Sequence, residues 1–251
     1  MTNIILNGCN GRMGKMITEL AQNYDDLKIV AGVDLYKTGN EPFPCYANIS
    51  EVKEEADVII DFSNVKAVDE VMAYAEEKKE GLVLCTTGLS DEQIEKVKSL
   101  SEKVPVLRSG NMSLGINTVM KVLNEISPKL LSAGFDADIV EKHHNKKLDA
   151  PSGTALMLAD SINEAVSDDY EYVFSRHERR MERPSKEIGI SAVRGGTIVG
   201  EHEVIFAGPD EIIEIKHTAL SRGVFANGAL NAALFIDGKN PGLYTMSDVV
   251  K

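Results

Sequence analysis

The densest group of reactive side chains lies in residues 141–155, which read EKHHNKKLDAPSGTA. Residues 142–147 alone hold two histidines and three lysines. If the backbone stays extended here, His143 and Lys147 lie on one face and can reach the same ligand. Imidazole and ammonium groups placed in this way can give a proton to a reacting molecule and hold its negative charge.

The residues that follow this cluster predict a helix start that can bind an anion. Ser152, Gly153 and Thr154 precede a helical stretch, so the first turn is expected to offer unpaired N–H groups. Such groups hold a carboxylate without carrying a formal charge. Pro151 fixes the backbone ahead of them, and Asp149 is placed to orient a neighbouring cation.

Simpler interpretations of these residues remain open. The paired histidines can be surface residues, and the lysines can form a solvated face. A metal site would have His177 and His202 as further ligands, but no HExxH or CxxC spacing supports one, so no metal site is predicted. We interpret Arg176, Arg183 and Arg194 as surface charges.

A second segment with functional potential is the glycine-rich turn Gly8–Gly14, which reads GCNGRMG. It follows the apolar run 3–6 and precedes a helical pattern at 15–23. In this context glycines and a helix N-terminus bind the pyrophosphate of a dinucleotide, although the spacing is GxxGxxG and not the stricter GxGxxG. The alternative is a glycine-rich turn in another kind of α/β protein. Cys9 within the turn is interpreted as a small space-filling residue.

Asp34 strengthens the dinucleotide interpretation. It ends the next apolar run, 20 residues beyond Gly14, where an acidic side chain binds the hydroxyls of the adenosine ribose. A carboxylate at this place repels a 2′-phosphate, so we expect NADH to be favoured over NADPH. The strand ends at 61–63, 86–88 and 109–112 are expected to line the ribose and nicotinamide, with ordinary capping and turn chemistry as the alternative.

The order of apolar runs predicts two domains. Up to about residue 112 short strands alternate with helices, which predicts a parallel sheet of Rossmann-like, doubly wound α/β type. Beyond it the pattern predicts an α+β domain with an open, mainly antiparallel sheet. Its expected elements are a helix at 116–131, a strand at 135–141, a helix after 152, and strands at 187–194, 197–206 and 211–217.

The domain boundaries follow from the same pattern. Gly195-Gly196 is a hairpin signal between two of the predicted strands. The tail, 224–236 and 241–250, has a helical, apolar pattern and is expected to return to the first domain. Residues 1–112 with 223–251 are thus predicted to form the dinucleotide-binding domain, and residues 113–222 the substrate-binding and oligomerisation domain.

Composition limits the possible functions. Hydrophobic residues make up 43% of the 251 residues and charged residues 26%, and no apolar run is long enough to span a membrane. The net charge of -12 argues against nucleic-acid binding, so an anionic substrate must be held by local positive charge. Three scattered cysteines and the lack of a signal peptide predict a cytoplasmic protein.

Taken together, the motifs resemble those of the 4-hydroxy-tetrahydrodipicolinate reductase (dihydrodipicolinate reductase) family. The resemblance rests on residues 141–155 and extends over essentially the whole chain through NGCNGRMG, CTTGL, SGNMSLGIN, RGGTIVGEHEV, SRGVFANGAL and GLYTMSDVV. It implies NADH- or NADPH-dependent reduction of a small cyclic dicarboxylate in the diaminopimelate–lysine pathway. It also implies a homotetramer, to which an open sheet face would contribute.

The resemblance further implies roles for individual residues. His143 would be the catalytic acid/base and Lys147 the proton donor, while His144, Gly153 and Thr154 would bind the substrate carboxylates. The residues that would contact the dinucleotide are Gly8, Cys9, Asn10, Gly11, Arg12, Met13, Asp34, Cys85, Thr86, Thr87, Ser109, Gly110, Asn111 and Met112.

Two positions depart from the family pattern. Family members commonly have glycine in place of Cys85, and some have arginine in place of Leu35. The first change is tolerable where contacts use the backbone. The second removes a partner for a 2′-phosphate, which adds to the case for NADH.

Two other classes of protein remain possible from the residues alone. One is a two-domain dehydrogenase for an aldehyde or hydroxy acid, and the other is a non-catalytic dinucleotide sensor. The clustered His143 and Lys147 argue against a sensor, because cofactor binding does not require them. In an enzyme, domain closure is expected to bring His143 over the nicotinamide, and either of the two residues can deliver the proton.

Overall fold

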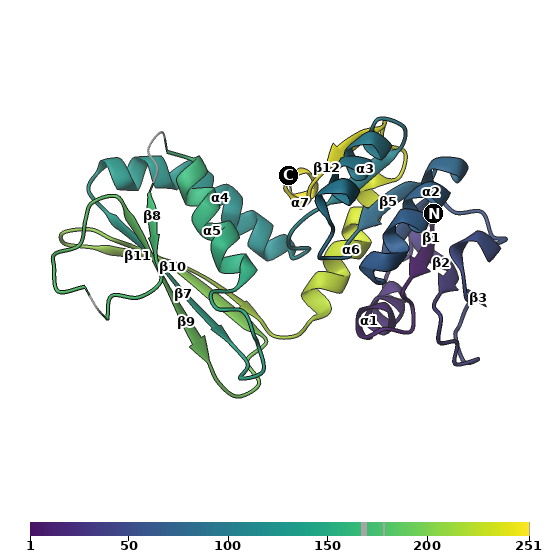
Figure 1. Cartoon of the computed structure of the whole chain (residues 1–251), viewed down its shortest axis with the longest axis horizontal. Helices are drawn as coiled ribbons and strands as arrows, with labels where there is room; N and C mark the ends of the chain where they lie inside the picture. The colour runs from purple at the N-terminus through teal and green to yellow at the C-terminus, as the bar shows by residue number, and fades with distance from the viewer. Residues whose placement is uncertain (167–169, 178, 251) are drawn as a thin grey trace. The chain divides into compact units, whose positions relative to one another are not determined.

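The computed structural model describes residues 1–166, 170–177 and 179–250 (Figure 1). The chain forms two compact units, Met1–Leu114 with Gly223–Lys251 and Gly115–Arg222. It enters the second unit two residues after the boundary that the sequence pattern suggested, and it returns to the first unit at Gly223. Among the described helices, none has the length and apolar character needed to cross a bilayer.

The sheet of the first unit is entirely parallel and has the strand order β12-β6-β5-β4-β1-β2-β3. The chain runs outward from β1 in one direction and from β4 in the other, so the strand order reverses between these two neighbours. Such a switch point is where open α/β sheets bind ligands. The strands are β1 (Thr2–Asn7), β2 (Leu27–Val33), β3 (Cys45–Tyr46), β4 (Val58–Asp61), β5 (Gly81–Leu84), β6 (Pro105–Arg108) and β12 (Gly242–Tyr244).

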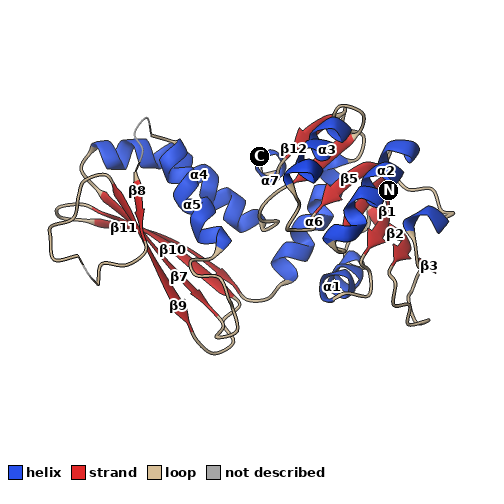
Figure 2. Ribbon diagram, viewed as in Figure 1, coloured by secondary structure: helices blue, strands red, loops and turns tan. Residues whose placement is uncertain are grey.

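Helices cover both faces of this sheet (Figure 2). Along β1, Ile4 and Leu6 pack into one core with α1 and α6, whereas Ile5 packs into the other with α2 and α3. The predicted doubly wound α/β fold is confirmed. The helices are α1 (Arg12–Ala21), α2 (Val68–Lys78), α3 (Asp91–Ser101), α6 (Gly223–Ile236) and α7 (Met246–Val249), with short 3-10 turns η1 (Ile49–Glu51) and η2 (Val65–Ala67).

The second unit is an α+β structure, as predicted, with the strand order β11-β10-β7-β9-β8. Its sheet is mixed, because β10 pairs antiparallel with both neighbours whereas β7–β9 and β8–β9 are parallel. Its strands are β7 (Asp136–His143), β8 (Glu171–Val173), β9 (Glu187–Arg194), β10 (Gly200–Ala207) and β11 (Ile212–Ala219), and its helices are α4 (Leu114–Ser132) and α5 (Gly153–Glu164).

Helices α4 and α5 lie on one side of the second sheet (Figure 2). On β7, Ala137 and Ile139 are fully buried in the core that these helices form with the sheet. Because side chains alternate along a strand, Glu141 and His143 point to the same side as these two residues, and both are buried. The strand that builds the core therefore also directs two ionisable groups into it.

The predicted hairpin between β9 and β10 is wrong. β7 lies between these two strands and pairs with each of them. The Gly195 N–H donates to the carbonyl oxygen of His143 at 2.9 Å, and the Asn145 N–H donates to that of Gly196 at 3.2 Å. The double glycine thus crosses the end of β7, and a local turn signal cannot reveal a strand inserted from earlier in the chain.

Three short strands were not predicted. β3, β8 and β12 have two or three residues each and lie at sheet edges, so they show little alternation in the sequence. The stretch 241–250, predicted to be helical, contains β12 and the short helix α7. α6 does return to the first unit, where it packs against α1 and β5.

Glu80, between α2 and β5, is a buried carboxyl group at 6% exposure. Burial raises its pKa to about 7, and the positive charge of Lys78 opposes this only in part. Its Oε2 atom has no hydrogen-bond partner among the residues that the structure describes. The folded chain therefore accommodates the charged form poorly.

We expect Glu80→Gln to raise the melting temperature above that of the parent at pH 8, with a smaller difference at pH 5. A carboxyl whose pKa is raised on folding stabilises most below its unfolded value of about 4.5, and this contribution is lost as the pH rises through about 7. Melting curves across this range measure the effect. Glu77→Gln, which removes a mostly exposed carboxylate, is the control, and a parallel pH trend in parent and E80Q would contradict the prediction.

Candidate functional site

The glycine-rich turn of the first unit depends on the absence of side chains. Gly8 has φ +81°, and a Cβ atom there would lie 2.6 Å from the carbonyl oxygen of Phe62 at the end of β4. A Cβ atom on Gly14 would lie 2.2 Å from the carbonyl oxygen of Gly8. The turn thus lies directly against β4 and against the first turn of α1.

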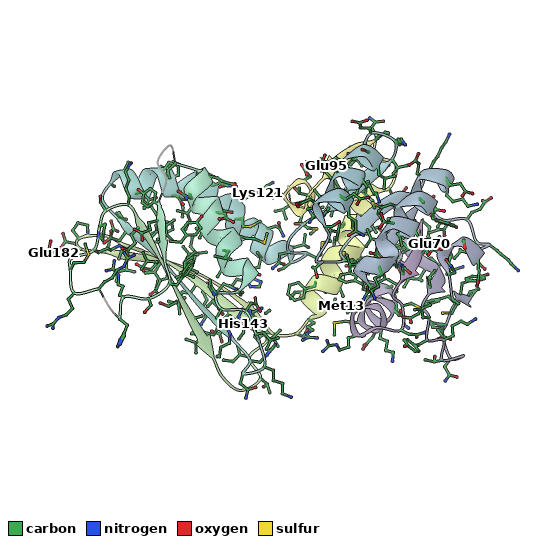
Figure 3. The ribbon with its side chains drawn as sticks, viewed as in Figure 1. Met13, Glu70, Glu95, Lys121, His143 and Glu182 are labelled. Atoms are coloured by element: carbon green, nitrogen blue, oxygen red, sulfur yellow. The ribbon has the colours of Figure 1, made fainter. Side chains whose placement is uncertain are left out.

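The start of α1 is suited to an anion. Gly11 precedes the helix, and within this fully described segment no side chain caps it and no acidic residue stands in its first turn. Met13 lies on this turn (Figure 3). The N–H groups and the partial positive charge of a helix N-terminus bind phosphate, as the dinucleotide interpretation requires.

A cavity of about 710 Å³ lies at the carboxyl ends of β1, β2 and β4, the switch point of the sheet. At its edge, Asp34 accepts hydrogen bonds from the backbone N–H groups of Asn10 at 3.0 Å and Tyr36 at 2.9 Å. Leu35 beside it is 80% exposed. The cavity is lined by Asn7, Gly8, Asn10, Gly11, Val33, Asp34, Leu35, Tyr36, Ala47, Asn48, Ile49, Phe62, Ser63, Asn64, Lys66, Ala67, Glu70 and Val71.

Asp61 ties the strand ends of this site together, a role that sequence reasoning missed. Its fully buried carboxylate accepts hydrogen bonds from Asn7 Nδ2 at 2.7 Å, Ser63 Oγ at 2.6 Å and Thr86 Oγ1 at 2.6 Å. These bonds fix the ends of β1, β4 and β5 to one another. An available signal was the occurrence of Asn, Asp and Thr at the ends of three neighbouring apolar runs.

Cys9 is a buried space-filling residue, as its position in the turn suggested. It is 3% exposed, and its Sγ atom lies 3.6 Å from that of Cys45. Burial raises the pKa of the Cys9 thiol, which keeps it protonated and unreactive. Cys85, at the end of β5, is also a free thiol whose pKa is raised by burial.

The segment after β6 is held by local bonds. Ser109 Oγ donates to the carbonyl oxygen of Asn111 at 3.1 Å, and Asn111 Oδ1 accepts from the Ser113 N–H at 2.8 Å. The Met112 side chain lies in the core, and its carbonyl oxygen packs directly against Gly228 of α6. The predicted dinucleotide contacts of these residues, and those of Arg12 and Thr87, stay predictions.

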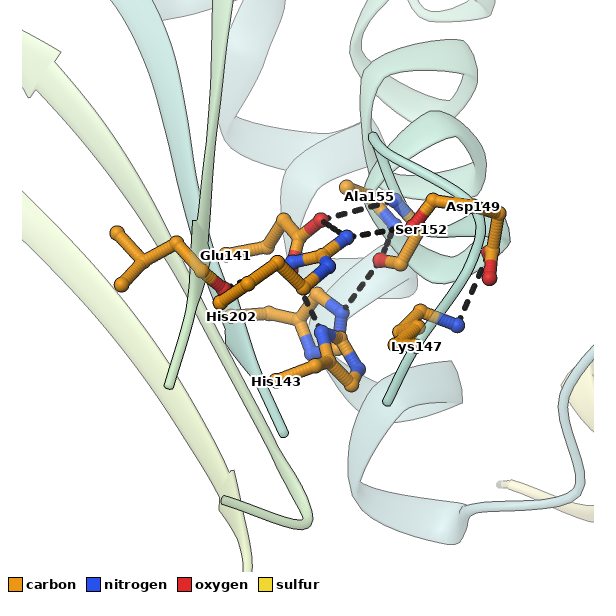
Figure 4. A network of polar contacts seen from close by, with 9 residues as sticks. Glu141, His143, Lys147, Asp149, Ser152, Ala155 and His202 are labelled. Carbon is orange, nitrogen blue, oxygen red and sulfur yellow. Dashed lines mark hydrogen bonds and ion pairs between the residues drawn. The ribbon is translucent and has the colours of Figure 1, made fainter. Parts of the chain in front are cut away.

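In the second unit, the reactive residues gather around the buried carboxylate of Glu141 (Figure 4). Its Oε2 atom lies 2.6 Å from His143 Nδ1 and 2.7 Å from Arg194 Nη1. Its Oε1 atom lies 2.6 Å from Arg194 Nη2 and accepts from the Ser152 N–H at 3.0 Å. Burial alone would raise the pKa of Glu141, but these hydrogen bonds outweigh it and lower the pKa.

A second histidine completes this group. His202 on β10 lies edge-on to His143 with ring centroids 5.1 Å apart, and its Nε2 atom lies 3.0 Å from Ser152 Oγ (Figure 4). Ser152 Oγ also accepts from the Ala155 N–H, which caps α5. Burial and the nearby His143 lower the pKa of His202 to about 4, so this ring is neutral at pH 7.

The backbone from 143 to 147 is not extended, so the condition under which His143 and Lys147 would share a strand face is not met. β7 ends at His143, and the chain turns, with the Lys147 N–H donating to the carbonyl oxygen of His144 at 3.1 Å. Lys147 Nζ bonds Asp149 Oδ2 at 2.9 Å, so Asp149 does orient a cation. The bond from Lys147 is the main reason that the pKa of Asp149 is lowered, and the backbone of Gly153 adds to this effect.

The three arginines interpreted as surface charges bind carboxylates instead. Arg194 forms the bidentate pair with Glu141, Arg176 binds the buried Glu187, and Arg183 binds Asp138. Sequence spacing could not show this, because each pair joins residues from different elements. In the part of the chain that the structure describes, no group of three or more His, Cys, Asp or Glu side chains is placed to hold a metal ion.

A Rossmann-type unit with a glycine turn at its switch point and an α+β unit with a histidine–lysine cluster are the parts of a two-domain, dinucleotide-dependent oxidoreductase. Matches to family models identify the family within this class. The chain belongs to the dihydrodipicolinate reductase family: the model of the family's N-terminus matches residues 2–112, and that of its C-terminus matches residues 115–250. The family inferred from the motifs is confirmed.

Curated relatives match this chain over nearly their full length. The 4-hydroxy-tetrahydrodipicolinate reductase of Caldanaerobacter subterraneus subsp. tengcongensis is 52% identical over 251 residues, which are 100% of this chain and 99% of that protein. The enzyme of the same name from Clostridium novyi is 51% identical over 252 residues, with the same coverage. A dipicolinate-bound dihydrodipicolinate reductase from Paenisporosarcina sp. TG-14 has a TM-score of 0.81 at 24% identity, covers 98% of this chain and 97% of its own, and has the same fold.

The geometry of the glycine turn leads to a prediction for Gly8→Ala. The new methyl group would require the turn to move away from Phe62, and positive φ costs a non-glycine residue roughly 1–2 kcal/mol. We expect NADH binding to weaken by at least about tenfold, measured by fluorescence titration. Gly134→Ala is the control, because Gly134 also has positive φ but has no atoms nearby. Equal NADH affinity in both variants would contradict the steric argument.

Proposed function

We propose that this protein reduces 4-hydroxy-tetrahydrodipicolinate to tetrahydrodipicolinate with NADH or NADPH, the reduction step of diaminopimelate and lysine biosynthesis. The observation that carries the proposal is the match of both family models, which together span residues 2–112 and 115–250. The chemistry of the two sites is consistent with it, as an anion-binding turn lies in one unit and cationic side chains lie in the other.

The first unit would hold the dinucleotide. The cavity at the switch point, the uncapped start of α1 and the close-packed Gly8 fit a pyrophosphate and an adenosine ribose. When bound, NADH supplies a hydride from C4 of its nicotinamide. Asp34 would accept hydrogen bonds from the ribose hydroxyls in addition to those that hold its carboxylate in place.

The second unit would hold the substrate by its two carboxylates. Lys147 and His144 lie in the turn after β7, and the N–H groups of Gly153 and Thr154 lie in the first turn of α5. Asp149 bonds Lys147, so a substrate carboxylate would compete with it for this cation. The positive charge beside the helix N-terminus would attract a dianion despite the net charge of the chain.

His143 or Lys147 would supply the proton that the reduction requires. Loss of the 4-hydroxyl group of the substrate as water gives a conjugated imine, and reduction at ring C4 leaves negative charge that needs a proton. A protonated His143 or Lys147 can supply it. Glu141 Oε2 lies 2.6 Å from His143 Nδ1, and Asp149 Oδ2 lies 2.9 Å from Lys147 Nζ, so each of the two groups is held by a carboxylate partner.

The test is oxidation of NADH by the purified protein, with substrate generated from pyruvate and aspartate semialdehyde by the preceding synthase. Rapid oxidation that depends on this substrate is the expected result. An aldehyde and a hydroxy acid as alternative substrates test for a different dehydrogenase. NADH binding without any turnover would contradict the proposal and favour a dinucleotide sensor.

Replacing Lys147 with Ala should lower kcat by on the order of 100-fold, within the range that a positioned proton donor contributes. Steady-state kinetics with the same substrate measures the change. Lys146→Ala is a matched control, because Lys146 is the exposed neighbour in the same turn. A kcat equal to that of the parent in K147A would exclude Lys147 as the donor.

We further propose that NADH is preferred over NADPH, because Asp34 lies at the edge of the cavity and Leu35 offers no cation for a 2′-phosphate. Leu35→Arg should then raise kcat/KM for NADPH by about tenfold, as expected for one charge-assisted contact, with little change for NADH. Met181→Arg adds the same charge at an exposed site of the second unit as a control. Equal kcat/KM for both cofactors in the parent would contradict the preference.

Assembly into a homotetramer through the second sheet is also proposed. Helices cover one face of this sheet, and on the other face residues of β10 and β11 are partly exposed, including Ile205 and Ile212. A partly apolar sheet face of this kind favours association with another copy. Light scattering that gave the mass of a single chain would contradict this proposal.

A further inference from the structure

Glu141 is the most completely bonded carboxylate around the histidine–lysine cluster. Both of its oxygens bind two partners, which come from β7, β9 and the start of α5. A buried carboxylate this close to a histidine controls which ring nitrogen carries hydrogen. The fold does not require a charged residue at this position, because Ala137 and Ile139 fill the same face of β7 with apolar side chains.

We propose that Glu141 is a positioning residue that keeps hydrogen on Nδ1 of His143 and thereby makes Nε2 the nitrogen that exchanges a proton with the substrate. The 2.6 Å contact joins Nδ1 to Oε2 of a carboxylate that already accepts three other hydrogen bonds, so Nδ1 is the donor. This inference rests on the proposed function, because it assigns His143 a part in the reduction.

Gly200 on β10 leaves space on the other side of the ring. A Cβ atom at this position would lie 3.1 Å from His143 Nε2, closer than ordinary van der Waals contact. Glycine therefore avoids a side chain pressing on the nitrogen that Glu141 leaves for proton exchange. The two residues act on opposite nitrogens of the same ring.

Four other segments place charged or titratable side chains around His143. Arg194 on β9 neutralises Glu141, and Lys147, paired with Asp149, lies in the turn before α5. His202 on β10 is neutral at pH 7 because burial and His143 lower its pKa to about 4, and burial also lowers the pKa of His217 on the neighbouring β11. His202 therefore adds no positive charge beside His143 at pH 7.

The same carboxylate also holds the start of α5. The Ser152 N–H donates to Oε1, and Ser152 in turn caps the helix and contacts His202. The Glu141 carboxylate therefore contacts both His143, the proposed acid, and Ser152 at the start of α5, the helix turn proposed to bind a substrate carboxylate. Loss of the carboxylate should disturb proton transfer more than it disturbs dinucleotide binding, which is a property of the other unit.

The experiment compares Glu141→Gln with Glu187→Gln in the full-length protein. Glu187 is a matched control, because its carboxylate is also buried in the second sheet and bound by arginines, but it lies far along β9 from the histidines. We expect E141Q to lower kcat by at least about tenfold and E187Q to change it by less than about twofold. Kd for NADH should be unchanged in both.

The pH profile separates positioning from a merely structural role. Glu141→Gln removes the negative charge that lies 2.6 Å from His143 Nδ1, so the pH profile of kcat should change in E141Q and not in E187Q. Glu141→Asp, which keeps the charge, should restore part of the rate. A profile and kcat in E141Q that match those of E187Q would overturn the proposal, while turnover by the parent would leave the reductase function intact.

A spectroscopic measurement tests the inference even if E141Q does not fold. In the parent protein labelled with ¹⁵N-histidine, the neutral form of His143, identified by its absence in His143→Asn, should carry hydrogen on Nδ1. A spectrum in which Nε2 carries the hydrogen would contradict the proposal whatever the activity of the variants.

Discussion

The second unit is organised around one constraint, the need to neutralise the buried charge of Glu141. Charged groups that are removed from water must be paired and hydrogen-bonded, and removing one partner of such a pair costs about 3–5 kcal/mol. Arg194 supplies the opposite charge from β9, and Ser152 supplies an N–H group from the start of α5. The pairing fixes β7, β9 and α5 at one point, and His143 lies at that point.

The first unit depends on close contact between backbone segments. Gly8 places its turn against Phe62, and Asp61 binds the polar ends of the strands on either side of β4. Together they bring the ends of β1 and β4 and the start of α1 to the edge of one cavity. Neither residue needs to touch a ligand to have this effect, because each acts by positioning the groups that line the cavity.

Much of the fold was predictable because its signals are local. The glycine turn, the helix start at Ser152 and the alternation of β7 each depend on neighbouring residues, and such local signals placed most helices and strands correctly. The hairpin between β9 and β10 was wrong because β7 enters from earlier in the chain. The role of Arg194 was missed because its partner is 53 positions away, on another strand, and nothing in the spacing of charges reveals such a pair.

By itself, the sequence determined the family, the two-unit order of the elements and the segment that holds the reactive histidines and lysine, since these depend on motifs and on local periodicity. Tertiary structure alone decided which groups meet. It ended β7 at His143, turned Lys147 toward Asp149, and brought Arg194, Ser152 and His202 around Glu141 and its neighbouring histidine. The physical reason is that a buried charge selects its partners in space, from whichever strands and helices the core packs beside it.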